Sequence, residues 1–329
     1  MNPGDAPRYD VIGMGNALVD VISHVDDAFL EAHGMVKGWM DLIDTERAVA
    51  IYDALGAAVQ MSGGSAANTI VGVASFGGRG AYIGKVSGDD LGNVFAHDLL
   101  AVGVRFHAGA RDNPDPTGRC MICVTPDAER TMNTYLGASS LLSPDDVDFA
   151  AVADARVLYM EGYLFDRDDA KAAFRAAAQV AHEAGRTVSL TLSDSFCVER
   201  HRDDFLALVS DEVDLLFGNE AELMALYQAD TLDAAIAAAR RECPLVACTV
   251  GARGSLVVTP EEALSSPAVP VRRVIDTTGA GDLYAAGFLH GITTGRTLAE
   301  CAQLGALAAA EVISHVGPRP LVELRTLLS

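Results

Sequence analysis

The sequence has few cysteines, little positive charge and no long hydrophobic run. Six cysteines in 329 residues are too few for a disulfide scaffold. No uninterrupted apolar stretch reaches the roughly 18 residues that suggest a membrane span. The chain has 24 Lys and Arg against 45 Asp and Glu, a net charge of −21, and it contains no basic run. Because phosphate contacts dominate nucleic-acid binding, no nucleic-acid partner is expected.

The first residues also lack the charged and apolar regions of a secretory signal, so we expect a cytoplasmic protein. Half of the residues are hydrophobic and 21% are charged, which is ample apolar material for a core. A length of 329 residues favours one large α/β domain, alone or with a small insertion, over two full domains. We therefore expect a single domain over residues 1–329.

Cys120 and Cys123 have the C-x-x-C spacing that redox and zinc sites use. They lie in an apolar, β-prone run at 119–125, and residues three apart on a strand point to opposite faces. No second Cys or His pair lies near them, and the eight histidines are scattered without ligand spacing. We interpret both as ordinary strand cysteines, and the sequence predicts no metal cage.

From about residue 156, β-prone runs alternate with Ala-rich helical stretches. Strands are predicted at 157–160, 187–192, 213–217, 245–250 and 255–259, and helices at 168–183, 219–227, 232–241, 279–294 and 298–314. This alternation predicts a mainly parallel sheet covered by helices on both faces.

The N-terminal half is organised differently. It opens with a predicted strand at 9–15, and a helix at 68–76 precedes a short strand at 81–84. The stretches 17–23, 36–43 and 118–135 are β-prone and punctuated by turns, which predicts a small antiparallel sheet apart from the main one. We expect this sheet to form a lid, built from about residues 17–44 and 110–135.

Two familiar phosphate-binding motifs are absent. Gly13 and Gly15 begin like a dinucleotide fingerprint, but its third glycine position is Leu18, which disfavours an NAD-dependent oxidoreductase. Lys85 follows a glycine as in a P-loop, but the next residue is Val86 and not Ser or Thr.

The segment from Asp276 to Asp282 is the strongest candidate. A predicted strand at 269–275 leads into Gly279, Ala280 and Gly281, which open a long helix. Their backbone N–H groups and the helix dipole would form an anion hole for a transferring phosphoryl group. Asp282, in the first turn, could accept the proton of an attacking hydroxyl. The alternative is that Asp282 caps the helix and the glycines form a tight turn.

Further polar elements support a phosphoryl-transfer site. A Gly-rich turn with Gly63, Gly64 and Asn68 precedes a helix. Asn219 and Glu222 follow a predicted strand, where the amide could bind phosphate oxygens and the carboxylate could hold hydrated Mg²⁺. The strand-to-turn segment at 249–254 is able to contact a nucleotide.

Over residues 9–320 the sequence resembles the ribokinase-like sugar and nucleoside kinases. The resemblance rests on the G-G-x-x-x-N element at 63–68 and the D-T-x-G-A-G-D element at 276–282. It implies a three-layer α/β/α sandwich with a mainly parallel central sheet and a β-sheet lid. It also implies ATP and Mg²⁺ as cofactors, with Asp282 as the base. It further implies that the amides of Gly279, Ala280 and Gly281 stabilise the developing charge. Asn219 would bind phosphate and Glu222 would bind Mg²⁺ through water. ATP would contact Thr249, Gly251 and Gly254, and a monovalent cation, K⁺, would bind at Asp276 and Thr278.

Within that family the chain is most similar to the adenosine kinase branch. The opening with Asn16 and Asp20 resembles that branch, which implies that both residues meet the nucleoside and that Asp20 grips the ribose hydroxyls. The remaining implied contacts are Gly63, Gly64 and Asn68 at the ribose; Cys123, Met132, Leu136 and either Leu164 or Tyr163 at the base; and Arg130 at the phosphates.

The resemblance implies transfer of the γ-phosphate of Mg·ATP to the 5′-hydroxyl of a purine nucleoside, with adenosine first. Glu161 departs from the branch: it is either a structural strand-end charge or an acceptor for the N–H groups of guanine. Guanosine or inosine, or a sugar (ribose, fructose or a sugar acid), therefore stay open as acceptors. A nucleoside-binding regulator without turnover is the non-enzymatic alternative. The sequence leaves monomer and homodimer equally open.

Overall fold

The computed structural model describes residues 6–127 and 129–328. Residues 1–5, which belong to the N-terminal stretch expected to lack a secretory signal, lie outside the described residues. Residue 128 of the expected lid also lies outside them. The strands are β1 (Tyr9–Met14), β2 (Leu18–His24), β3 (Met40–Leu42), β4 (Ala58–Gly63), β5 (Gly80–Gly84), β6 (Arg105–Ala108), β7 (Gly118–Val124), β8 (Arg130–Tyr135), β9 (Ala155–Glu161), β10 (Thr187–Thr191), β11 (Leu215–Asn219), β12 (Leu245–Thr249), β13 (Ser255–Val258) and β14 (Ala263–Ser266). The helices are α1 (Asp27–Ala32), α2 (Thr45–Ala54), α3 (Ser65–Ser75), α4 (Asp90–Ala101), α5 (Phe149–Ala153), α6 (Asp168–Glu183), α7 (Ser195–Arg200), α8 (Arg202–Glu212), α9 (Glu220–Tyr227), α10 (Leu232–Glu242), α11 (Ala280–Thr293) and α12 (Leu298–Val312).

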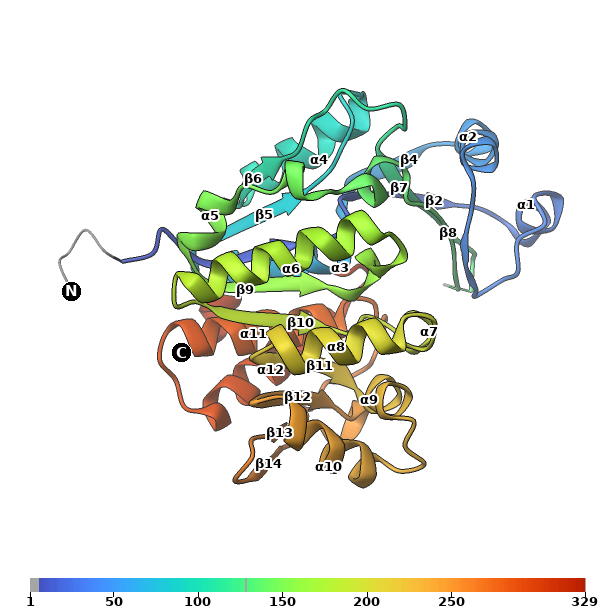
Figure 1. Cartoon of the computed structure of the whole chain (residues 1–329). Helices are drawn as coiled ribbons and strands as arrows, with labels where there is room; N and C mark the ends of the chain where they lie inside the picture. The colour runs from blue at the N-terminus through green and yellow to red at the C-terminus, as the bar shows by residue number, and fades with distance from the viewer. Residues whose placement is uncertain (1–5, 128, 329) are drawn as a thin grey trace.

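The large sheet has nine strands in the order β14-β13-β12-β11-β10-β9-β1-β5-β6. All neighbours from β12 to β6 pair in parallel, and β13 and β14 add an antiparallel edge. Figure 1 shows α6 and α8 on one side of this sheet and α11 and α12 on the other. The expected three-layer α/β/α sandwich with a mainly parallel sheet is thus confirmed.

The helices follow the apolar pattern of the sequence closely. Helix α6 spans the predicted residues and buries Ala173, Phe174, Ala177 and Ala181, a stripe with the helical period of about 3.6 residues. The predicted strand at 269–275 is wrong, because this segment is not a strand. It lies between β14 and α11, where the N–H of Ile275 donates to the carbonyl of Ile313 beyond α12 (2.8 Å). A β-prone run without a neighbouring strand edge cannot form a ladder.

The second sheet has the order β3-β8-β7-β2-β4. The expected antiparallel sheet is mixed: β2 pairs with β4, and β7 with β8, in antiparallel fashion, whereas β2 pairs with β7, and β3 with β8, in parallel. Strand β4 and helix α2 also belong to this unit, although both lie outside the predicted lid stretches. Figure 1 shows the small sheet with α1 and α2 at one end of the large sheet. We call this unit the lid.

The two faces of the lid sheet differ in what they carry. Cross-strand pairing places Asp20 beside Cys120 and Ile22 beside Ile122, which in turn pairs with Met132. The opposite face carries Val19, Val21 and Met121, which pack in the same core cluster as Ala48 and Ile51 of α2. Adjacent residues of a strand point to opposite faces, so Cys120 and Cys123 are separated as expected. We call the face with Asp20 the site face of the lid.

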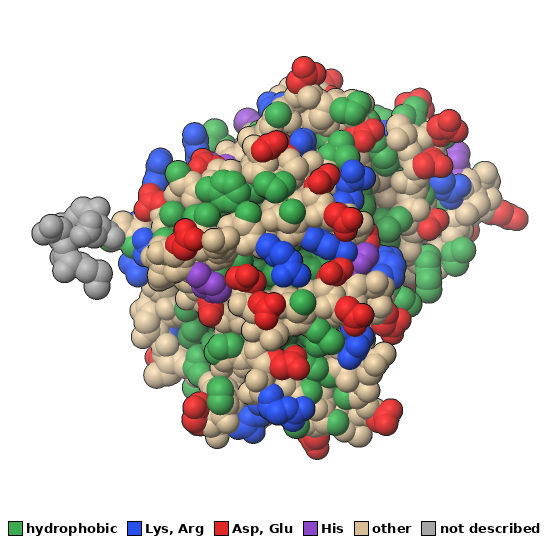
Figure 2. Space-filling model, in the orientation of Figure 1, with side chains coloured by type: hydrophobic (Ala, Val, Ile, Leu, Met, Phe, Trp, Pro, Cys, Tyr) green, Lys and Arg blue, Asp and Glu red, His purple; other side chains and the backbone are tan. Residues whose placement is uncertain are grey.

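The strand order reverses beside β1, which is flanked by β5 on one side and β9 on the other. In open α/β sheets, ligands bind outside the carboxyl ends of the strands at such a switch point. Asn16, just after β1, and Glu161, the last residue of β9, both lie at this position. Among the described residues, no helix is long and apolar enough to cross a membrane. On the face shown in Figure 2, Lys and Arg side chains are interspersed with Asp and Glu.

Candidate active site

Two helix N-termini meet at the carboxyl edge of the large sheet. Asp282, in the first turn of α11, accepts a hydrogen bond from Ser65 Oγ (2.7 Å) and another from Asn68 Nδ2 (3.2 Å), both on α3. In the sequence, Ser65 is 217 residues and Asn68 is 214 residues away from Asp282. The structure therefore brings both predicted motifs together around one carboxylate, and Asp282 does not cap its own helix, whose N-cap is Gly279.

The electrostatic setting of Asp282 suits a base. Burial raises its pKa to about 6, against the opposing influence of the bonds from Ser65 and Asn68 and of the positive charge of Arg319. A carboxylate with a raised pKa takes a proton more readily than an ordinary aspartate, yet it is still ionised near neutral pH.

The predicted anion hole keeps most of its donors free. Gly279 has φ +78° and is the N-cap of α11, which begins at Ala280. A side chain at Gly279 would collide with Pro318, 2.7 Å from its Cα, so packing as well as φ demands glycine there. The N–H of Ala280 donates to the Thr277 carbonyl (3.2 Å). Among the described residues, the N–H groups of Gly279 and Gly281 have no protein acceptor, and Gly281 is exposed.

Asp276 is surrounded by donors just before this hole. Its Oδ1 accepts from the N–H and Oγ1 of Thr278 (2.9 and 2.7 Å), and its Oδ2 accepts from the N–H of Gly317 (2.9 Å). Arg130, the first residue of β8, forms an ion pair with the same Oδ2. Although burial opposes it, these donors and the Arg130 charge hold the pKa of Asp276 below its usual range.

Asp20 lies on the site face of the lid and is 7% exposed. It packs over Gly63, where a Cβ would come within 2.6 Å of its carboxylate oxygens, so the glycine makes room for the acid. No donor among the described residues binds the Asp20 carboxylate. Burial raises its pKa to about 6, while the charges of Arg319 and Arg130 oppose the rise.

Asn16 and Glu161 bind each other. Glu161 Oε1 accepts from the N–H and Nδ2 of Asn16 (3.2 and 3.1 Å), and its Oε2 accepts from the N–H of Ala66 (2.8 Å). Ser139 Oγ donates to Asn16 Oδ1 (3.0 Å). Both side chains are almost fully buried. Glu161 therefore ties the end of β1 to the start of α3, as in the structural interpretation of this residue. Gly64, with φ +94°, allows the close approach of that turn to the backbone of Asn16.

Asn219 and Glu222 form a capping box at the start of α9, a structural role that the sequence analysis did not consider. The N–H of Glu222 donates to Asn219 Oδ1 (3.0 Å), while the N–H and Nδ2 of Asn219 donate to the Glu222 carboxylate (2.9 and 2.5 Å). Burial raises the pKa of Glu222 to about 7. Both residues line a small cavity of about 80 Å³ together with Ser65, Ser193 and Asp282.

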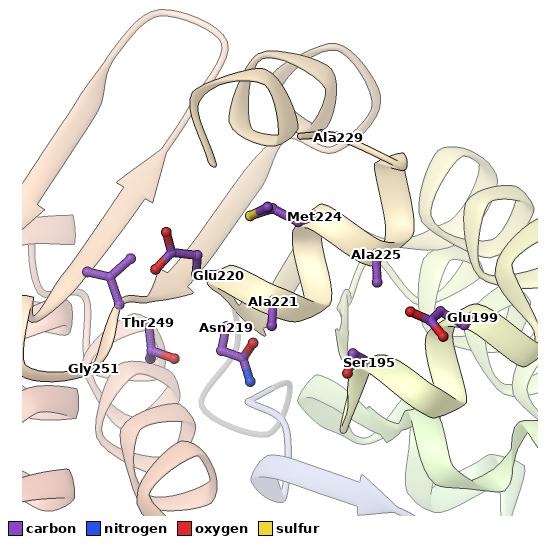
Figure 3. Close-up of a pocket in the computed structure, with 11 residues that line it drawn as sticks. Ser195, Glu199, Asn219, Glu220, Ala221, Met224, Ala225, Ala229, Thr249 and Gly251 are labelled. Carbon is purple, nitrogen blue, oxygen red and sulfur yellow. The ribbon is translucent and has the colours of Figure 1, made fainter. Parts of the chain in front are cut away.

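A larger cavity of about 730 Å³ lies beside it, between α7, α9 and the end of β12. Figure 3 shows Asn219 and Thr249 at its base, with Gly251 on one wall and Ser195 and Glu199 on the other. The predicted nucleotide segment thus reaches this cavity through Thr249 and Gly251. Gly254 does not line it; with φ +97° it packs against the backbone of Ser266, which leaves no room for a side chain.

The predicted base contacts are divided by the structure. Met132 lies on the site face of the lid, and Leu136 follows the same strand. The prediction for Cys123 is corrected: it lies on the far face, and Cys120 is the cysteine beside Asp20. Leu164 is 3% exposed and packs in the core beneath α6, and its contact with the base stays a prediction.

The neighbour of Leu164 takes a different position. The Tyr163 hydroxyl lies 3.4 Å from the carbonyl of Ser193, to which it donates. Ser193 lines the small cavity with Asp282, whereas Tyr163 itself packs against the same core cluster as Leu164. One residue that contacts the site was missed by the sequence analysis. Arg319 donates from Nε to Asn68 Oδ1 (3.1 Å) and from Nη1 to Ser62 Oγ (2.8 Å). It lies outside every motif, and no sequence signal marks it.

The chain belongs to the pfkB family of carbohydrate kinases, whose model matches residues 35–324. The structure is similar to that of adenosine kinase from Sinorhizobium meliloti, with 51% identity, a TM-score of 0.89 and 98% of each chain covered. It is also similar to a probable sugar kinase from Rhizobium etli CFN 42, with 47% identity, a TM-score of 0.90 and 98% of each chain covered. Adenosine kinase of Saccharomyces cerevisiae is 29% identical over 333 residues, which cover 94% of this chain and 96% of that protein.

Family and fold together define the class of chemistry. The chain is a phosphotransferase that uses ATP and acts on an alcohol group. The carboxylate of Asp282 beside the free amides of Gly279 and Gly281 is the arrangement that such a transfer requires.

Proposed function

We propose that this kinase transfers the γ-phosphoryl group of Mg·ATP to the 5′-hydroxyl of a purine nucleoside, with adenosine as the preferred acceptor and AMP as the product. The similarity to adenosine kinases from two organisms supports this acceptor. The similarity to a probable sugar kinase keeps a free sugar as the second candidate. We place the activity in the cytoplasm, where ATP is supplied.

Asp282 removes the proton of the acceptor hydroxyl as that oxygen attacks the γ-phosphorus. Ser65 and Asn68 hold the carboxylate in place. The free N–H groups of Gly279 and Gly281, with the dipole of α11, stabilise the negative charge that develops on the phosphoryl oxygens. The Ala280 amide can join them only by giving up its turn bond to Thr277. The transfer is in line, and no covalent enzyme intermediate is needed.

The chain offers a fitting place for the nucleotide and its magnesium. We assign the larger cavity, with Thr249 and Gly251, to ATP. Glu222 shares the small cavity with Asp282. Each of its oxygens accepts one bond from Asn219 and keeps a second lone pair, which is suited to hold hydrated Mg²⁺. Bound Mg²⁺ would neutralise charge on the phosphates. The capping bond of Asn219 Nδ2 uses one of its two N–H groups, which leaves the other for a phosphate oxygen.

A monovalent cation at Asp276 and Thr278 is a less direct fit. Thr278 and Gly317 already donate to Asp276, and the guanidinium of Arg130 neutralises its charge. A potassium ion there would compete with Arg130 for the same carboxylate. If Arg130 binds phosphates as predicted, it must leave Asp276 and free that carboxylate. No step of the proposed mechanism therefore requires potassium, and its effect on the rate is measured separately.

The lid carries the observation that favours a nucleoside over a free sugar. Beside Asp20, its site face presents Ile22 and Met132, and Met40 pairs with Met132 on the next strand. Met40 and Leu42 are 40% and 46% exposed. A free sugar has hydroxyl groups all round and gains little from such a surface, whereas a flat heterocyclic base buries its apolar faces against it. Asp20, which has no donor of its own, can accept from both hydroxyls of a ribose diol.

The partners of Glu161 favour adenine over guanine. Recognition of guanine would require this carboxylate to accept N–H groups from the base. Both of its oxygens already accept from Asn16 and Ala66, and the side chain is 1% exposed. The pocket therefore presents no free carboxylate at this position, and guanosine becomes the weaker purine candidate.

The proposal is tested by measuring ADP release from the purified protein with Mg·ATP. Adenosine, guanosine, inosine, ribose and fructose are compared, each with potassium and with choline as the monovalent cation. We expect adenosine to have the highest kcat/KM. A preference for ribose or fructose would overturn the nucleoside proposal and would leave the phosphotransferase class intact. Equal rates in potassium and choline would remove the predicted cation.

A further inference from the structure

We propose that Arg319 is a positioning residue of this kinase: it orients Asn68, and through it the base Asp282, and it is the counter-charge of the carboxylates at the acceptor end. Arg319 belongs to the segment after α12, far in sequence from every other residue of the site. The proposal deepens the proposed function and rests on Asp282 acting as the base.

The position of Arg319 is set by its own segment. The N–H of Gly317 donates to Asp276 Oδ2 (2.9 Å). Pro318 lies directly against Gly279, where a Cβ would be 2.7 Å from the Pro318 Cα. The residues just before Arg319 are therefore packed against the loop that forms the anion hole. This segment couples the C-terminal end of the chain to the phosphoryl-transfer end of the site.

The contacts of Arg319 leave Asn68 one orientation. A guanidinium only donates hydrogen bonds and a carboxylate only accepts them. The amide of Asn68 lies between the two, with Oδ1 toward Arg319 Nε (3.1 Å) and Nδ2 toward Asp282 Oδ2 (3.2 Å). A flipped amide would lose both bonds. Without the guanidinium, nothing else in the described residues donates to Asn68 Oδ1, so the amide would be free to turn away from the base.

Arg319 is also the positive charge that two site carboxylates share. It lowers the pKa of Asp20 and of Asp282, both of which burial raises to about 6. Arg130 also lowers the pKa of Asp20, by less than Arg319 does, and the negative charge of Asp282 raises it. The other groups that face this cluster are Asp98 on α4, Tyr82 on β5 and Glu161 on β9.

The guanidinium itself is buried at a cost. Its Nη2 has no hydrogen-bond partner within residues 6–127 and 129–328, and the two partners that it does bind, Ser62 and Asn68, are neutral. A charged group buried without a hydrogen-bonded carboxylate weakens a fold. An arginine kept only for stability would be better placed on the surface. The arrangement therefore favours a role in the reaction over a role in folding.

The test compares Arg319→Met and Arg319→Lys with wild type and with Arg325→Met. Arg325 lies in the same C-terminal region, is exposed, and pairs with Glu323, so it is the matched control. We expect Arg319→Met to lower kcat by about 10-fold to 100-fold through misplacement of the base. The acidic limb of its kcat profile should move up by roughly 0.5 to 1 pH unit, because the carboxylates lose their counter-charge. Arg319→Lys should restore the position of that limb, and Arg325→Met should match wild type.

A second readout does not depend on any acceptor. The difference in melting temperature between Arg319→Met and wild type should be more negative at pH 7.5 than at pH 5, because at pH 5 Asp20 and Asp282 are protonated and no longer need the counter-charge. The same difference at both pH values, or a wild-type kcat and pH profile, would overturn the proposal. If wild type turns over none of the acceptors, the proposed function fails, and the pH dependence of melting still decides the role of Arg319.

Discussion

The two ends of the active site are built in contrasting ways. At the phosphoryl-transfer end, Asp282, Asp276 and Glu222 each accept hydrogen bonds from neighbouring residues. At the acceptor end, the Asp20 carboxylate has no donor among the described residues, and apolar side chains such as Met40 and Leu42 are exposed on β3 of the same sheet. At the first end the protein holds the carboxylates in place and leaves the amides of Gly279 and Gly281 for phosphate oxygens, whereas at the second end the carboxylate itself is left for a ligand.

This difference separates chemistry from specificity. The transfer step needs groups held rigidly before the substrate arrives, because orientation must not be paid for during the reaction. Recognition needs unpaired polar atoms and open apolar surface, which are costly without the ligand. Substitutions at the first end should therefore lower kcat, and those at the second should change acceptor binding and raise the stability of the free protein.

The largest effect is expected for Asp282→Asn. The substitution keeps the shape of the side chain but removes the proton acceptor, so kcat should fall by at least about 10²-fold with little change in the KM for ATP. Steady-state ADP release measures both constants. Asp233→Asn on the exposed start of α10 is the control. Near wild-type turnover of Asp282→Asn would contradict its role as the base.

A smaller loss of activity, together with a gain in stability of the free protein, is expected for Asp20→Asn. Loss of a charge-assisted bond to the acceptor should raise its KM by about 10-fold to 100-fold. Because burial raises the pKa of Asp20 to about 6, its ionised form weakens the fold above that pH. Removal of the charge should therefore stabilise the free protein at pH 7.5 by on the order of 2 kcal/mol.

Acceptor titrations measure the expected rise in KM of Asp20→Asn, and urea unfolding measures its expected gain in stability. The gain in stability should be present above pH 6 and should shrink as the pH falls through 6 toward 4, where wild-type Asp20 is itself protonated in the fold. An unchanged acceptor KM would exclude Asp20 from the acceptor site. A loss of stability at pH 7.5 would show that an unidentified donor already satisfies the carboxylate.

The pH profile of the wild type should reflect the same carboxylates. Asp282 has a pKa raised to about 6 and acts only when it is ionised, so kcat should fall as the pH drops below about 6. A slope of one power of ten per pH unit is expected for a single group. A profile flat down to pH 4.5 would mean that burial does not raise the pKa of the base.

The smallest effect is expected for a pair of cysteines. Cys120 lies beside Asp20 on the site face, and Cys123 lies on the far face of the same strand. Cys120→Ala should raise the acceptor KM by a few-fold, about 2 to 5. Cys123→Ala should leave KM and kcat unchanged and lower only the melting temperature. The reverse pattern would place the acceptor on the other face of the lid.

The parts of the fold that the sequence predicts are those in which local pattern and tertiary setting agree. The stripe of α6 and the strands from β9 to β13 have apolar periods that fit only one element type. The segment at 269–275 shows the limit: its residues are β-prone, but no strand edge lies beside it. Strand β4, with a sequence of mixed polarity, was missed because its pairing with β2 depends on residues about 40 positions away along the chain.

The residues of the site also differ in how well the sequence predicted them. The motifs at 63–68 and 276–282 identified Asn68, Asp282 and the free amides, because anion binding at a helix N-terminus demands small residues in a short stretch. The capping box of Asn219 and Glu222 shows that the same residues also have a local structural role. The base contacts were less predictable, since a shift of one residue along a strand moves a side chain to the other face.

The sequence by itself determined the chemistry of this protein: a phosphoryl-transfer motif, an acid in its first turn and the alternation that builds a parallel sheet. These are local properties, because a turn or a helix start is specified by a few adjacent residues. Only the tertiary structure decided which face of the lid meets the site, that Glu161 is occupied by Asn16 and Ala66, and that Arg319 reaches Asn68. Those contacts join residues that are distant in the chain, and packing alone brings them together.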